Sequence, residues 1–350
     1  MVINVNKEVD LSKYELRTDL AIDSIDNSSN LEGIDKSIED LNGIKVTAVK
    51  VNEIGSKKIN KKVGNYITVE FDDVTDSNNR QKVLEVFSNE LKKLLRLVQI
   101  KDNDSCLVIG LGNSASTPDS LGPLSINNIL ITNHLFELNE LSDGFRRVSA
   151  INPGVMGTTG IETSDIILSI VEKLKPDFAL VVDALASGSI ERVNKTIQMT
   201  DTGIHPGSGV GNSRKEISKD ILKIPVIAIG VPTTVDAVTI VSDTINYMYK
   251  HFSYTKENVN NPSNRLMVST PNYLKKDIRV DNKDKNNLLG LVGLLNEEEV
   301  KQLIFEVLTP IGYNLMVTPK EIDFLVDKLA YVIGNGINKA LHNNSIDIAN

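Results

Sequence analysis

The sequence predicts an α/β fold with a mostly parallel central sheet. Between residues 107 and 182, short apolar runs of the length of buried strands alternate with segments of helical spacing. The apolar runs cover residues 107–110, 147–150 and 178–182. A strand–helix–strand–helix–strand order with right-handed crossovers produces neighbouring parallel strands with helices on their faces. We therefore expect three layers, with extra antiparallel strands and a helical C-terminal part supplied by the rest of the chain.

The N-terminal part of the chain is polar and is followed by two alternating segments. Residues 1–43 are rich in Asn, Asp and Ser, a composition that favours a mobile arm. Apolar and polar residues alternate at 44–51 and again at 65–71, which is typical of half-buried strands. We expect these two strands to pair antiparallel and to be joined by a basic loop at 55–64.

Helical spacing follows on both sides of the first buried strand. Residues 79–100 carry apolar side chains on one helical face and predict an amphipathic helix. A second helix is expected from about 119 to 131. After the next strand, a Gly-rich loop at 152–160 leads into an expected helix at 162–173.

The remainder of the chain adds two strands and several helices. We expect strands at 193–199 and 225–230 and a helix at 236–250. Further helices are expected at 297–308 and 319–341. Thr318 is the expected N-cap of the last one, because Pro319 and Glu321 follow at the positions that favour a helix start. Without an internal repeat or a clear linker, residues 20–350 are expected to form one elaborated domain.

The composition limits the possible partners. The chain has 350 residues, of which 41% are hydrophobic, so it can bury a large core. A net charge of -8 argues against binding to nucleic acid, which requires clustered Lys and Arg. No run reaches the ~18–20 apolar residues of a membrane span, and residues 1–10 lack the apolar core of a secretory signal. We expect a cytoplasmic protein without a membrane partner.

The single cysteine is Cys106, so an internal disulfide is excluded, which fits a reducing compartment. Cys106 opens a predicted central strand, and we expect it to have a packing role.

Three kinds of chemistry have little support in the sequence of the Gly-rich turn after residue 110 and of the other loops. Gly110, Gly112 and Ala115 satisfy a dinucleotide-binding fingerprint, but Thr117 and Pro118 interrupt the helix that should bind the phosphates. The four histidines are scattered and no Cys pair exists, so no metal or other cofactor is expected. The serines near the loops lack the elbow motif of a nucleophile.

A pair of carboxylates is the remaining possibility. Asp119 and Asp183 each lie at or just past the end of an apolar strand. Because strands of one parallel sheet end at the same edge, two such residues can converge on one cleft. Two close carboxylates resist double ionisation, which leaves one acid and one base to activate water and protonate a leaving amine. At a strand end an aspartate can equally serve as an N-cap or loop hydrogen bonder.

Several long motifs resemble those of the germination protease family, the endopeptidases that degrade small acid-soluble spore proteins in spore-forming bacteria. In chain order they are R-T-D-L-A-I-D (17–23), G-L-G-N-x(3)-T-P-D-x-L-G-P (110–123), N-P-G-V-M-G-x-T-G (152–160), D-A-L-A-S (183–187), H-P-G-S-G-V-G-N (205–212), G-V-P-T-T-V-D-A (230–237) and G-Y-N-L-M-V-T-P-K-E-I-D (312–323). The matches extend from end to end of the chain.

This resemblance implies a fold similar to that of the hydrogenase-maturation proteases, assembly as a homotetramer and an aspartic-type mechanism carried by Asp119 and Asp183. It also implies a zymogen that loses a short N-terminal segment. Substrates of the family are cut after Glu in T-E-[IF]-A-S-E, and T-D-L-A-I-D at 18–23 is a near-copy of that target. We therefore expect residues 1–19 to be a propeptide removed by self-cleavage between Asp19 and Leu20. Asp19 stands where substrates carry Glu, so self-cleavage is expected to be slower or conditional.

An acidic side chain before the cut bond requires a cationic or amide-lined pocket. Arg192, Arg214 and Lys215 are candidates for it, and Asn113 and His205 are further candidates for substrate binding. Two other functions stay open. One is a metal-guided maturation endopeptidase of the same fold, in which the two aspartates hold nickel or zinc. The other is a catalytically silent protein that binds spore proteins.

Overall fold

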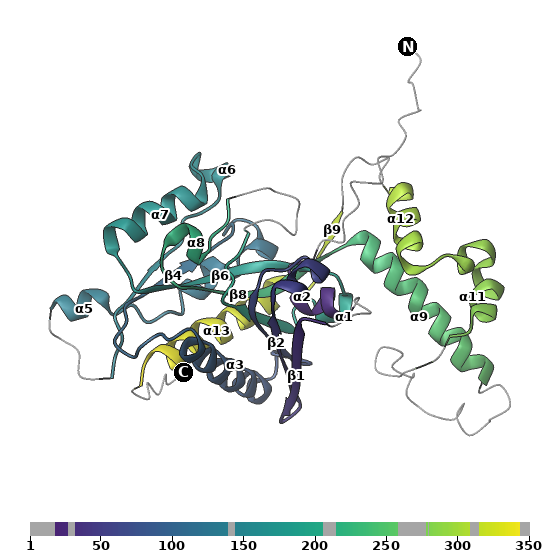
Figure 1. The fold of residues 1–350 in the computed structure, drawn as a ribbon, viewed down its shortest axis with the longest axis horizontal. Helices are drawn as coiled ribbons and strands as arrows, with labels where there is room; N and C mark the ends of the chain where they lie inside the picture. Colours follow the sequence, from purple (N-terminus) through teal and green to yellow (C-terminus); the bar gives the residue numbers. More distant parts are fainter. Residues whose placement is uncertain are drawn as a thin grey trace, which may run out of the picture. The chain divides into compact units, whose positions relative to one another are not determined.

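The computed structural model describes residues 18–26, 32–138, 144–205, 215–257, 278, 280–308 and 315–343. Within them, one sheet has the strand order β1-β2-β3-β7-β8-β6-β4-β5, and β9 pairs with β8 (Figure 1). The strands are β1 (Ile34–Leu41), β2 (Ile44–Val51), β3 (Gly64–Glu70), β4 (Cys106–Gly110), β5 (Val148–Ile151), β6 (Phe178–Ser187), β7 (Thr196–Thr200), β8 (Val226–Asp236) and β9 (Met316–Val317).

The sheet has a parallel part and an antiparallel part. Strand β4 pairs parallel with both β5 and β6. Strands β1, β2, β3, β7 and β8 pair antiparallel in that order. The predicted α/β class is confirmed, as are the three parallel strands and the antiparallel pair at 44–51 and 65–71.

Helices make up much of the rest of the described residues. They are α1 (Ala21–Asp26), α2 (Glu53–Ile59), α3 (Ser77–Leu97), α4 (Leu121–Ile126), α5 (Asn133–Glu137), α6 (Met156–Thr159), α7 (Thr163–Leu174), α8 (Lys219–Leu222), α9 (Ala237–Glu257), α11 (Asn282–Leu289), α12 (Glu297–Leu308) and α13 (Ile322–Leu341). Short 3₁₀ helices within the described ranges are η2 (Thr117–Asp119), η3 (Ile190–Arg192) and η5 (Gly290–Leu294). In Figure 1, α3 and α13 lie on one face of the sheet and α7 and α8 on the other.

Alternation along β6 fills both layers of the core. Leu180 and Val182 belong to the apolar cluster that contains α3 and α13. Ala179 and Val181, on the opposite face, pack in a second cluster with α7 and α8. The expected packing role of Cys106 is confirmed, because its side chain is buried and the burial raises the pKa of its thiol.

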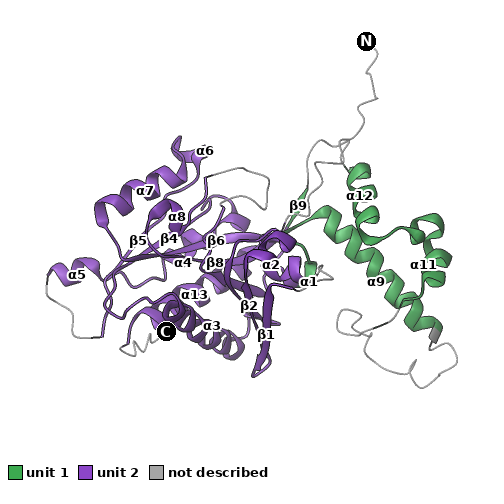
Figure 2. Cartoon of the chain, viewed as in Figure 1, with its two compact units in different colours: residues 1–16, 188–191, 235–317 green, residues 17–187, 192–234, 318–350 purple. Residues whose placement is uncertain are grey.

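The chain divides into two compact units, coloured separately in Figure 2. One comprises residues 17–187, 192–234 and 318–350 and contains most of the sheet. The other comprises residues 1–16, 188–191 and 235–317. Within that second unit, Val300 and Ile304 of α12 pack on Val238 of α9. Asp119 and Asp183 both lie in the first of these units.

The expected mobile arm over residues 1–43 is wrong for the described residues in that range. Residues 18–26 form a short extended segment and α1, and residues 34–41 form β1, which pairs with β2 over its whole length. Leu20, Ile22 and Ile25 are buried, as is Ala21 between the first two. The remainder of the expected propeptide, residues 1–17, lies outside the described residues.

Four other local expectations are corrected. The basic loop at 55–64 contains helix α2, which Asn52 caps by accepting hydrogen bonds from the first N–H groups. The helix expected at 119–131 is two shorter pieces, η2 and α4. Thr318 is not an N-cap; its hydroxyl donates to the carbonyl of Thr233, and α13 begins at Ile322. Strand β6 continues five residues beyond its expected end, so Asp183 lies inside the strand.

Candidate active site

Asp119 is held against the end of β4 by a tight turn. Gly112 has φ +111°, and a Cβ at that position would lie 2.0 Å from the carbonyl oxygen of Asp119. The backbone N–H of Asn113 donates both to that carbonyl oxygen, at 3.0 Å, and to Oδ2 of the Asp119 carboxylate, at 2.9 Å. From β8, the hydroxyl of Thr233 donates to the carbonyl of Pro118. The turn therefore fixes one carboxylate just past a buried strand.

Asp183 lies on the neighbouring strand. Strands β4 and β6 are parallel, with Gly110 opposite Val182, and the N–H of Leu111 donates to the carbonyl of Val182 at 2.8 Å. The loop that carries Asp119 therefore starts beside the residue that precedes Asp183. The Asp183 side chain is 5% exposed, and its Oδ1 accepts a hydrogen bond from the N–H of Ala184 at 2.9 Å.

The residues on either side of the predicted cleavage bond bind to the last residues of β6. The N–H of Asp19 donates to the carbonyl of Ala186 at 3.0 Å. In return, the N–H of Ala186 donates to Oδ2 of Asp19 at 2.8 Å. Leu20 is fully buried in a cluster with Leu185 and Ile22. Because side chains alternate along a strand, Leu185 shares a face of β6 with Asp183, about 7 Å farther along.

The segment is held at further points by charged and polar groups. The amine of Lys61 donates to the carbonyl oxygens of Thr18, at 3.0 Å, and Asp19, at 3.3 Å. Burial lowers the pKa of Lys61, and the negative charges of Asp19 and Asp23 oppose this change. Gln198 on β7 donates from Nε2 to the Asp19 carbonyl at 3.3 Å.

Arg192 binds Asp23. Its guanidinium forms a buried ion pair with Asp23 and a second contact, at 3.3 Å, with Glu70. The Asp23 carboxylate also accepts hydrogen bonds from the hydroxyls of Thr18, at 2.5 Å, and Ser187, at 3.3 Å. Of the residues predicted for a cationic pocket, Arg192 therefore contacts two carboxylates of the fold. The Asp19 carboxylate accepts a hydrogen bond from the backbone N–H of Ala186.

The other predicted substrate-binding residues have local partners. The Asn113 side chain accepts from the N–H of Ala115 at 3.0 Å, which closes the turn before Asp119. His205 is half exposed and faces Glu216, with 3.4 Å between Nε2 and Oε2. Lys215 is exposed and pairs with Asp165. Arg214 lies outside the described residues.

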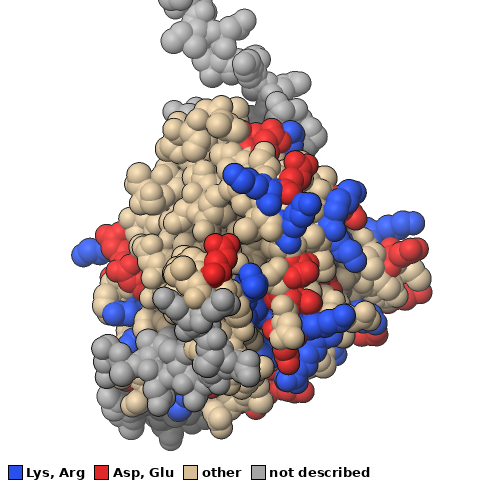
Figure 3. All heavy atoms as spheres, turned by 90° about the vertical axis from the view of Figure 1, so that its left-hand side faces the viewer, with Lys and Arg blue, Asp and Glu red and all other residues tan. Residues whose placement is uncertain are grey.

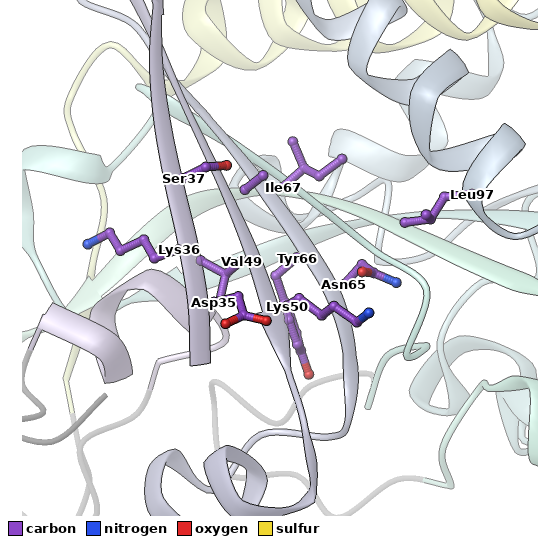
Figure 4. Close-up of a pocket in the computed structure, with 10 residues that line it drawn as sticks. Asp35, Lys36, Ser37, Val49, Lys50, Asn65, Tyr66, Ile67 and Leu97 are labelled. Carbon is purple, nitrogen blue, oxygen red and sulfur yellow. The ribbon is translucent and has the colours of Figure 1, made fainter. Parts of the chain in front are cut away.

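A pocket of about 290 Å³ lies elsewhere, on β1, β2 and β3 (Figure 4). Lys36, Lys50 and Tyr66 are among its lining side chains, whereas neither Asp119 nor Asp183 lines it.

Among the described residues, no three His, Cys, Asp or Glu side chains gather as they would around a metal ion. None of the helices built from those residues is long and apolar enough to cross a membrane. On the face drawn in Figure 3, basic and acidic side chains are interspersed.

Two residues of the site carried no signal in the sequence. Lys61 stands in a stretch of basic residues that is otherwise typical of a solvated loop, and Gln198 is a single polar residue inside a strand. Their contacts with Asp19 depend on chain segments more than 40 and more than 170 residues away in sequence. Only the folded chain brings these groups together.

Comparison with known proteins identifies relatives over nearly the whole chain. A family model described as "Germination protease", of a peptidase family, matches residues 12–350. The germination protease of Geobacillus sp. (strain WCH70) is 51% identical over 97% of this chain and 96% of its own length. That of Bacillus cereus (strain ATCC 10987 / NRS 248) is 49% identical over the same shares, 97% and 96%.

A solved structure was also matched. It is the [NiFe] hydrogenase maturation protease HycI from Thermococcus kodakarensis KOD1, with 19% sequence identity, a TM-score of 0.27, and coverage of 41% of this chain and 80% of that one.

Proposed function

The chain belongs to the germination protease family, and on that basis we propose that it is the endopeptidase that starts the degradation of small acid-soluble spore proteins. Membership of the family makes it a peptidase that acts in spore germination. The finer parts of the proposal are an aspartic-type mechanism with Asp119 and Asp183, and synthesis as a zymogen that cleaves itself after Asp19.

The observation that carries the mechanism is the register of two neighbouring strands. Gly110 of β4 is opposite Val182 of β6, and the turn after β4 is hydrogen-bonded to Val182. Asp119 is in the turn after β4, and Asp183 is the residue of β6 that follows Val182, so both lie beyond the carboxyl end of β4, where ligands bind in open α/β folds. This arrangement supports a shared task for the two carboxylates.

In the proposed reaction, one carboxylate is ionised and the other is protonated. The ionised one takes a proton from water, and the water oxygen adds to the carbonyl carbon of the peptide bond. The protonated one donates its proton to the carbonyl side of the adduct. When the adduct collapses, the nitrogen takes the proton that came from water, the C–N bond breaks, and the proton on the former carbonyl oxygen returns to the second carboxylate. Water is consumed, and the products are a carboxylic acid and an amine.

The self-cleavage part of the proposal is supported by the position of the N-terminal segment. Thr18 to Leu20 lie along Leu185 and Ala186, on the strand that carries Asp183. Helix α1 begins at Ala21, directly after the proposed P1′ residue Leu20. Cleavage within one chain is favoured because Asp19 and Leu20 already lie on the strand that carries Asp183, so no second molecule has to bind them. The shorter side chain of Asp19, compared with the Glu of substrates, is consistent with a slow reaction.

The proposal includes a setting for the enzyme. We place it in the cytoplasm of the forespore and in the spore core, as a homotetramer of 38.4 kDa chains without cofactor or nucleic-acid partner. Size-exclusion chromatography with light scattering tests the assembly, since a mass of one or two chains would contradict a tetramer.

The direct test of the function is an incubation of the purified chain with a peptide that contains T-E-I-A-S-E. We expect new termini after the Glu of the peptide and a new N-terminus at Leu20 of the chain itself. A scrambled peptide of the same composition is the control. Intact peptide after prolonged incubation with a chain whose N-terminus has been removed would contradict the proposal.

Two alternatives are separated in the same experiment. Inhibition by a strong chelator, with recovery on addition of nickel or zinc, would favour a metal-guided endopeptidase in which the two aspartates hold the metal. Stable binding of the peptide without any new terminus would favour a binding protein that has lost catalysis.

A further inference from the structure

Two side chains from different parts of the fold converge on one carbonyl oxygen, that of Asp19. Lys61, in the loop between α2 and β3, donates from its amine at 3.3 Å. Gln198, in the middle of β7, donates from Nε2 at the same distance. This is the carbonyl of the bond between Asp19 and Leu20.

Gln198 also contacts the far side of that bond. Its Oε1 accepts a hydrogen bond of 2.7 Å from the N–H of Ala21. The side chain therefore spans from the carbonyl before Leu20 to the amide after it. Gln198 is 5% exposed, and strand β7 is paired on both sides, opposite Thr68 of β3 and Gly230 of β8, so the amide is held by a rigid part of the sheet.

We propose that Lys61 and Gln198 bind the carbonyl oxygen of Asp19 and stabilise the negative charge that builds up on it, before the protonated carboxylate donates its proton there, when the bond between Asp19 and Leu20 is hydrolysed. The inference rests on the proposed self-cleavage after Asp19 and adds two catalytic residues to it. As the water oxygen bonds to the carbonyl carbon, the C=O π electrons move onto the carbonyl oxygen, which the two N–H donors stabilise. When the C–N bond breaks, the electrons return and the proton released by the water reaches the nitrogen of Leu20.

The surroundings make these donors effective. A donor that is fixed and shielded from water before the reaction stabilises a developing charge more than a solvated one does. Burial lowers the pKa of Lys61, which reflects such shielding. Both contacts are at the long end of the hydrogen-bond range, which leaves room for them to tighten as charge develops.

The two donors can be tested separately from the docking of the segment, because other contacts hold the segment in place. Leu20 and Ile22 are buried with Leu185, and Asp23 is bound by Arg192. Removal of the Lys61 amine leaves these contacts intact.

The experiment compares Lys61→Met and Gln198→Leu with the natural chain and with a control, Lys58→Met. Lys58 lies on α2 and binds the exposed Glu32, so its loss removes a nearby positive charge and an ion pair at the surface. Two quantities are measured: the first-order rate of appearance of the Leu20 terminus, by mass spectrometry, and the amide hydrogen exchange of residues 18–26.

We expect Lys61→Met and Gln198→Leu each to slow self-cleavage about 100-fold or more, while exchange at residues 18–26 stays within a few-fold of the natural chain except at Ala21 in Gln198→Leu, whose N–H loses its acceptor. Lys58→Met should match the natural chain in both. A rate for Lys61→Met equal to that of Lys58→Met would overturn the inference, and so would a rate loss accompanied by loss of protection, because the residues would then only dock the segment. A natural chain that is cut elsewhere refutes the proposed cleavage site, and this inference with it.

Discussion

The guanidinium of Arg192 and the carboxylate of Asp23 form a buried ion pair, with 15% and 1% of the two side chains exposed. The pair joins the residues just after the proposed cleavage bond to the short helix η3 that follows β6. Glu70 contacts the same guanidinium from β3. Arg192 is therefore a positioning residue for the N-terminal segment in this structure.

We expect Arg192→Met to release that segment. Removing one partner of a buried ion pair leaves the other charge buried and costs about 3 kcal/mol or more. Denaturant unfolding should show this loss, and hydrogen exchange at residues 18–26 should accelerate more than at α3. Lys215→Met, which removes an exposed pair with Asp165, should leave stability nearly unchanged. If both substitutions change the free energy of unfolding and the exchange at residues 18–26 equally little, the ion pair with Asp23 does not hold the N-terminal segment.

We expect Asp19→Ala to block maturation. The substitution removes the carboxylate that accepts the N–H of Ala186 and with it the fixed position of the bond to Leu20. N-terminal sequencing over time should find no Leu20 terminus, whereas Asp35→Ala, in the exposed part of β1, should mature normally. Maturation of the Asp19 variant at an unchanged rate, or at another residue in the natural chain, would contradict the assigned site.

We expect Gly112→Ala to abolish peptidase activity. A Cβ there meets the carbonyl oxygen of Asp119 at 2.0 Å, and the φ of +111° is unfavourable for any other residue. The turn must move, and the Asp119 carboxylate with it. Gly157→Ala is the control, because no atom lies within 4 Å of the added Cβ. If the Gly112 variant retains the peptide-cleavage rate of the Gly157 variant, the position of Asp119 is not critical.

The buried His342 predicts a loss of stability at acid pH. Its Nδ1 accepts from the N–H of Arg146 at 3.2 Å, and burial, with the nearby charge of Arg146, lowers its pKa from 6.5 to about 4. The unfolded chain thus binds a proton below about pH 6.5 that the folded chain does not. The free energy of unfolding should therefore fall between pH 6.5 and 4, by about 2–3 kcal/mol from this group.

Urea unfolding at several pH values measures this effect. His342→Gln retains an acceptor for the Arg146 N–H but cannot titrate, so its stability should change less over the same range. Parallel pH profiles for the two proteins would show that the imidazole is not the source.

The sequence predicts well those elements whose pattern is local. Helix α3 carries apolar residues at helical spacing, and strands β4 and β5 are short apolar runs. The predicted first and last residues of each element therefore lie within three residues of the observed ones. The candidate pair Asp119 and Asp183 comes from two apolar runs that each precede an aspartate, and the structure places these runs, β4 and β6, side by side. A shared catalytic role for the two residues stays a prediction.

Elements that depend on distant contacts could not be predicted. The segment from Leu20 to Ile25 looks like part of a polar arm, and it is ordered because Leu185 and residues of β2 and β3 bury its apolar side chains. The apolar run at 178–182 predicts that β6 ends at Val182. It continues to Ser187, where Ala186 pairs with Asp19.

The most direct test of the account is the cleavage activity of Asp119→Asn and Asp183→Asn, each nearly isosteric with the natural residue. New termini are followed by mass spectrometry on the chain itself and on the peptide with T-E-I-A-S-E, and circular dichroism verifies folding. Asp165→Asn, at an exposed site on α7, is the matched control. The account predicts that both variants fold and lose about 100-fold or more of both activities, while the control retains them. Full activity of either variant would contradict the carboxylate pair.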